Sequence, residues 1–127
     1  MLTKLAFIDL KLAIQRIDIP EWNDCVYIKK LSANQRAQIL KNNFKIEGTD
    51  LGINADAFAD NVVRTCQFTI CDDKGVRLFD DSKADFDILD GKDGAILERI
   101  FNVVMESNGM TVKEEKEAMG NLDSSRN

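Results

Sequence analysis

Residues 62–122 decide the fold of this chain and read VVRTCQFTICDDKGVRLFDDSKADFDILDGKDGAILERIFNVVMESNGMTVKEEKEAMGNL. β-Branched residues are dense over 62–71, which predicts a strand. Residues 72–75, Asp-Asp-Lys-Gly, predict a tight turn because glycine readily takes a positive φ. A short return strand over 76–79 completes a predicted hairpin.

Helices are predicted to follow this hairpin. An acidic segment, 80–93, contains a helical turn expected over 84–89. The strongest helical pattern covers 94–107, and Asn108 with Gly109 is a typical helix stop. Four apolar residues in this helix recur at the spacing of one face, so we expect them in the core. They are Leu97, Ile100, Phe101 and Val104.

The N-terminal half predicts two further strands and a helix. Residues 13–19 alternate loosely and end at Pro20, the only proline, and residues 25–31 are expected to pair with them in antiparallel fashion. Ser32 and Gln35 form a capping box for a helix that should end near residue 43.

Three segments complete the predicted organisation. Residues 45–54 contain two glycines and are predicted as a loop. Residues 55–61 are either a helical turn capped by Asn54 or an extension of the following segment. Thr111 and Glu114 form a second capping box, for a short helix over 112–119.

Length and pattern together predict one domain. We expect a single α+β domain over 1–122, with a small antiparallel sheet of about four strands packed against three or four helices, and a frayed tail at 123–127.

Composition narrows the functional classes. The net charge is −5 and the isoelectric point about 4.7, so nucleic acid is not an expected partner. No apolar run is long enough to cross a bilayer, and the N-terminus lacks the features of a signal peptide, so no membrane association is expected. Three cysteines without framework spacing predict buried, reduced thiols in the cytosol.

The residues that catalysis usually needs are scarce. The chain has no histidine, which removes the commonest general base and zinc ligand. Cys66 and Cys71 are expected on opposite faces of a strand, as core thiols. A calcium loop starting at Asp87 would place Leu89 at position three and Lys92 at position six, so it fails. We therefore predict no catalytic residue, cofactor or metal, and expect the acidic loop to cap helices.

Several alternatives remain open. Carboxylate pairs such as Asp72 with Asp73 suit turns, although a metal-dependent hydrolase using the acidic loop is the competing enzymatic hypothesis. Trp22 and Tyr27 are the candidate partner-binding residues, and Trp22 is either an exposed anchor or a lid over the core. The segment 62–79 either offers an edge for strand addition or is an ordinary edge blunted by lysine and arginine.

Three motifs carry a family resemblance. IPEW at 19–22 followed by CVYIKKLSANQRAQIL at 25–40 resembles the opening of tail assembly chaperones from long-tailed phages and prophages. TICDDKGVRLFDD at 69–81 is similar to their central hairpin. ILERIFNVVMESNGMT at 96–111 is similar to their closing helix and turn, with Met110 in place of leucine. The prefix 2–12 and the serine- and asparagine-containing tail depart from the family pattern.

The resemblance implies a non-enzymatic protein of the host bacterial cytoplasm. Members of that family are expected to bind the tape measure protein and recruit tail tube subunits during tail morphogenesis, with self-association as a further expectation. The alternative that we keep open is a structural or adaptor component of the phage tail.

Overall fold

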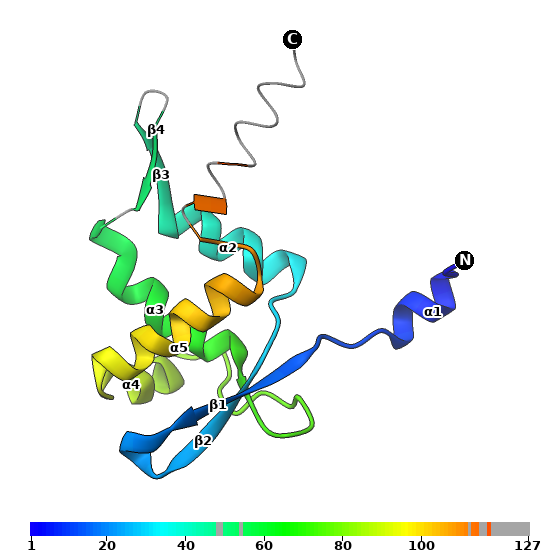
Figure 1. Ribbon diagram of the computed structural model, residues 1–127, viewed down its shortest axis with the longest axis horizontal. Helices are drawn as coiled ribbons and strands as arrows, with labels where there is room; N and C mark the ends of the chain where they lie inside the picture. Colours follow the sequence, from blue (N-terminus) through cyan, green and yellow to red (C-terminus); the bar gives the residue numbers. More distant parts are fainter. Residues whose placement is uncertain (48–49, 54, 112, 115–116, 118–127) are drawn as a thin grey trace.

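A computed structural model describes residues 1–47, 50–53, 55–111, 113–114 and 117 (Figure 1). In these residues the class is α+β, as predicted. The main sheet has three strands in the order β1-β2-β5, one fewer than expected, and a separate two-stranded hairpin stands apart from it.

The sheet is built on the predicted N-terminal hairpin. β1 (Ile14–Ile19) pairs antiparallel with β2 (Asp24–Lys29), which confirms both strands with small shifts of their ends. They are joined by η1 (Pro20–Trp22) and by Asn23, whose φ of 52° is left-handed, a conformation that asparagine tolerates better than most residues. On its other side β2 pairs with the two-residue strand β5 (Ile70–Cys71).

The strand predicted over 62–71 is wrong except at its end. α3 (Ala55–Thr69) occupies nearly all of it and includes 55–61, and only β5 is extended. Phe58, Val62 and Cys66 recur at four-residue spacing and pack into the core, so burial along one helical face outweighs the β propensity of valine and threonine. Asn54, the proposed cap, lies outside the described residues.

The turn at 72–75 is confirmed. Gly75 has a φ of +86° and its N–H donates to Asp72 O at 3.0 Å. The return strand over 76–79 is reduced to an isolated bridge between Cys71 and Arg77. Leu78 N also donates to Ile70 O at 3.1 Å, so this segment covers the outer edge of β5.

The predicted capping box starts the next helix. α2 (Ala33–Asn43) begins after Ser32, whose hydroxyl accepts from Gln35 N while Gln35 Oε1 accepts from Ser32 N. The loop predicted over 45–54 is wrong for the described residues, because β3 (Phe44–Glu47) and β4 (Asp50–Ile53) form an antiparallel hairpin there. Gly52, one of the two glycines that suggested a loop, lies inside β4 opposite Lys45.

The C-terminal helices follow the sequence closely. α4 (Lys83–Asp90) replaces the expected helical turn, and α5 (Gly94–Ser107) has the predicted bounds. Asp93 caps α5 by accepting from Ala95 N at 2.9 Å, as expected of an acidic loop that caps helices. After α5, Gly109 takes a φ of +65°. Glu114 N donates to Thr111 Oγ1 at 3.2 Å, while most of the short helix predicted over 112–119 lies outside the described residues.

α3 is the central helix and contacts α2, α4 and α5. The side chains predicted for the core face of α5 are buried, as expected, and meet α3 together with Ile17, Ile19 and Ile28 from the sheet. Asn108 joins the two ends of this core: its Oδ1 accepts from Leu31 N at 3.2 Å, and its backbone oxygen accepts from Arg36.

Candidate functional site

The thiols of the core are not available for chemistry. Cys66 lies on α3 rather than on a strand and donates to Leu97 O at 3.7 Å, and burial raises its pKa to about 12. Burial also raises the pKa of Cys71. Both thiols are protonated at neutral pH, whereas the nucleophile and metal ligand is the thiolate.

The aspartates of the turns act as acceptors for backbone N–H groups. Asp72 Oδ1 accepts from Lys74 N and Val76 N at 2.9 Å each, and these bonds hold its pKa below the ordinary value. The Ser82 hydroxyl and N–H lower the pKa of Asp80 in the same way. Among the described residues no three cysteine, aspartate or glutamate side chains gather as a metal site. These carboxylates have structural partners, as is common for aspartate in turns.

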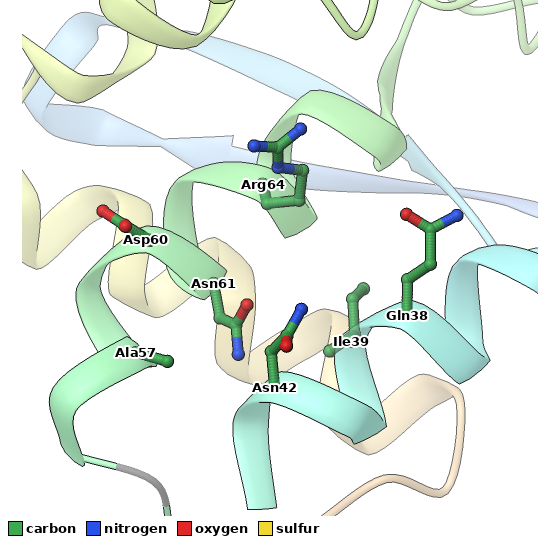
Figure 2. Close-up of a pocket in the computed structure, with 7 residues that line it drawn as sticks. All are labelled: Gln38, Ile39, Asn42, Ala57, Asp60, Asn61 and Arg64. Carbon is green, nitrogen blue, oxygen red and sulfur yellow. The ribbon is translucent and has the colours of Figure 1, made fainter.

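A polar cleft of about 330 Å³ separates α2 from α3 (Figure 2). Asn42 and Asn61 point toward one another across it. Asn61 is only 4% exposed, and its Nδ2 has no hydrogen-bond partner within the described part of the chain. The lining is completed by Gln38, Ile39, Ala57, Asp60 and Arg64. This cleft can hold water or a small hydrogen-bonding group, but its buried lining brings no nucleophile or acid–base pair.

The most unusual surface is an N-terminal arm, which we define as residues 1–12. It contains α1 (Lys4–Asp9), capped by Thr3 and without a single buried residue. Leu5, Phe7 and Ile8 are 75%, 61% and 67% exposed. Figure 1 shows α1 standing away from the other helices at the end of an extended segment. A helix that is apolar on several sides is normally covered, so this arm is suited to contact another chain.

The two candidate partner-binding residues occupy different places on the first hairpin. Trp22 lies at the closed end, in η1, and is 41% exposed outside the core, so it does not form a lid. Glu21 beside it accepts from Arg99 at 3.0 Å, which ties this end of the hairpin to α5 and lowers the pKa of Glu21. Tyr27 lies in the middle of β2, half-buried, opposite Arg16 on β1. Their role in binding stays a prediction.

The N-terminal arm was missed as a site by sequence reasoning, which tested it as a signal peptide and otherwise treated it as a departure from a family pattern. Leu2, Leu5, Ile8 and Leu12 recur every three or four residues, and this signal identifies an apolar helical stripe. The strand edge expected over 62–79 is also wrong, because α3 fills 62–69, β5 has only two residues, and the return segment makes only an isolated bridge to Cys71.

Comparison with known proteins gives no relative: no protein-family model, no curated protein and no solved structure matches this chain. Within the described residues, none of the helices combines the length and apolar character needed to cross a bilayer.

Proposed function

We propose that this protein is a tail assembly chaperone of the long-tailed phage and prophage type. It binds the tape measure protein and recruits tail tube subunits in the cytoplasm of the host bacterium, without enzymatic activity. The observation that carries a protein-binding role is the N-terminal arm, which presents apolar side chains that the rest of the described chain leaves uncovered. The choice of family rests on the sequence motifs, and the arm lies outside them.

The physical basis is the need to cover a long helical partner. A tape measure is an extended, largely helical chain whose apolar stripes aggregate if they stay exposed before the tube forms. An apolar helix such as α1 covers a stripe of this kind by helix packing. The net charge of −5 keeps the resulting complexes apart in solution.

Two of the three sequence motifs that resemble the family also support the proposal; the central motif keeps its turn but not its return strand. IPEW forms the last residue of β1 and η1, and the second part of the first motif forms β2 and the capped start of α2. The last motif forms α5 and the glycine that follows it. The resemblance therefore falls on residues that connect β1 to β2, start α2 and end α5.

Co-expression with the adjacent tape measure protein tests the proposal. We expect the full chain to keep the tape measure soluble and to co-purify with it. The arm variant Leu5→Asp/Ile8→Asp should lose both effects, because acidic groups replace the apolar contacts. Val76→Asp/Leu78→Asp is the matched control, since it adds the same two charges at residues that are 62% and 58% exposed and lie outside the arm.

Two outcomes would contradict the chaperone function. One is a tape measure that is equally soluble without this protein and does not co-purify with it. The other is finding the protein in purified mature particles, which would favour the structural or adaptor alternative.

A further inference from the structure

The first strand has an open edge. β1 pairs only with β2 among the described strands. Lys30 N donates to Ala13 O at 2.9 Å, and hydrogen-bonded pairs alternate along an antiparallel ladder. The N–H and C=O groups of Ile14, Arg16 and Asp18 therefore point away from β2. Unpaired groups of this kind form a template for another strand.

The charges along this edge are self-complementary. Arg16 and Asp18 flank Ile17, are well exposed, and form a 2.9 Å ion pair on the same strand. If two copies of β1 pair antiparallel with Ile17 opposite Ile17, each Arg16 faces the other copy's Asp18. The neighbouring registers place Arg16 opposite Arg16, or Asp18 opposite Asp18, and like charges directly opposite are destabilising.

We propose that two copies of this chain associate through β1, antiparallel, with Ile17 on the twofold axis. The two sheets then join into one continuous sheet of six strands. A twofold interface uses the same surface on both copies, so the Arg16–Asp18 contact forms twice.

The same register accounts for exposed apolar residues on either side of β1. It brings the start of one β1, with Ile14, beside the other copy's η1, which begins at Pro20 where that strand ends. Leu12, Ile14 and Trp22 are all exposed in the single chain. Figure 1 shows the arm leaving the opposite end of β1 from η1, so an arm does not cover the Trp22 of its own chain. Pairing brings these separated apolar groups together.

This association is independent of the proposed function, but it would double the arms on each particle. α1 lies beyond the paired segment and stays free in both copies. Two linked arms bind one long partner more tightly than a single arm, because the second contact is intramolecular.

Sedimentation of the full-length protein over a range of concentrations tests the proposal. We expect a dimer that dissociates on dilution. Arg16→Asp alone sets Asp against Asp at both contacts, and Asp18→Arg alone sets Arg against Arg. Each should weaken the dimer by about tenfold or more. An equimolar mixture of the two single variants should recover dimers, since one chain is then all acidic and the other all basic at these positions.

A matched control separates register from general charge. Lys83→Asp removes an equally exposed pair, Lys83 with Asp87 at 2.9 Å on α4, and should leave the dimer unchanged. Circular dichroism confirms that each variant is folded. A wild-type monomer at every concentration, or a mixture of the two β1 variants that fails to restore dimers, would overturn the proposal. If the protein is a monomer, a strand from a different protein is the alternative partner for the β1 edge.

Discussion

Replacing Phe101 by alanine tests whether α5 closes the core. The ring is 3% exposed, and its centroid lies 5.6 Å from that of Phe58 at an interplanar angle of 86°, an edge-to-face pair. Removing a buried phenylalanine ring costs about 3–5 kcal/mol of unfolding free energy. The contact with Phe58 accounts for about 0.5–1.5 kcal/mol of that loss.

The loss is large compared with the stability of a domain of this size. Native domains are typically stable by about 5–15 kcal/mol. With an unfolding entropy of about 2.1 cal/mol/K per residue, the expected loss lowers the melting temperature by roughly 10–20 °C. We therefore expect Phe101→Ala to be folded at low temperature but to unfold well before the parent protein.

Urea denaturation at one fixed protein concentration measures the change. Phe7→Ala is the matched control, because the Phe7 ring is 61% exposed on α1 and its removal should change the free energy by no more than about 0.5 kcal/mol. The double variant Phe58→Ala/Phe101→Ala should cost less than the sum of its parts, since the aromatic pair is lost only once. A cost below about 1 kcal/mol for Phe101→Ala would refute the assignment of α5 to the core.

Four further predictions follow from the chemistry of the site. At pH 8, iodoacetamide should label the partly exposed Cys25 before Cys66, whose burial raises its pKa to about 12; equal labelling rates by peptide mass spectrometry would contradict this. The raised pKa of the Cys66 thiol also makes the fold lose stability as the pH rises from about 9 towards 12, because the thiol ionises at a lower pH in the unfolded chain than in the folded one. Cys66→Ala should lack this decline in thermal melts. Asp72→Asn should lower the melting temperature at pH 7, and this effect should shrink as the pH falls below the ordinary carboxyl pKa of about 3.9. The lowered pKa of Asp72 stabilises the fold above that value, and the stabilisation is lost as the pH falls through the pKa of the folded state. Calorimetry with calcium, magnesium and zinc should show no micromolar binding, and a stoichiometric isotherm with any of them would revive the metal-dependent hydrolase.

The elements predicted correctly are those whose local sequence pattern is compatible with only one type of secondary structure. The apolar spacing in α5 and the Ser32–Gln35 box of α2 are such signals, because each specifies a helix from a few adjacent residues. The strands β1 and β2 likewise follow from alternation around the only proline.

The segment that became α3 carries conflicting signals. Its valines and threonines favour a strand, whereas the helical spacing of Phe58, Val62 and Cys66 matters only once α2 and α5 are present to bury that face. Thr69 remains compatible with the helix because its hydroxyl donates to Thr65 O at 2.7 Å. Tertiary packing decides such a segment, and one sequence does not reveal its packing partners.

The candidate site was less predictable than the fold. The sequence identified Trp22 as a candidate partner-binding residue but left open whether its side chain is exposed. The packing of the hairpin against α5 decides that question. Sequence reasoning had no cause to single out the N-terminal arm, because apolar composition does not distinguish a buried helix from an uncovered one. The cleft that contains Asn61 depends on the separation of two helices, which is a property of packing alone.

The link made by Asn108 has a consequence for synthesis of the protein. The backbone N–H of Leu31 reaches its partner 77 residues later in the chain. At a translation rate of about 5–20 residues per second, the ribosome needs about 4–15 s to supply that partner. During this interval the first hairpin and α2 have been made but lack the cover of α5. A stalled nascent chain that ends before α5 begins at Gly94 therefore exposes the inner face of its sheet to the quality-control machinery of the cell.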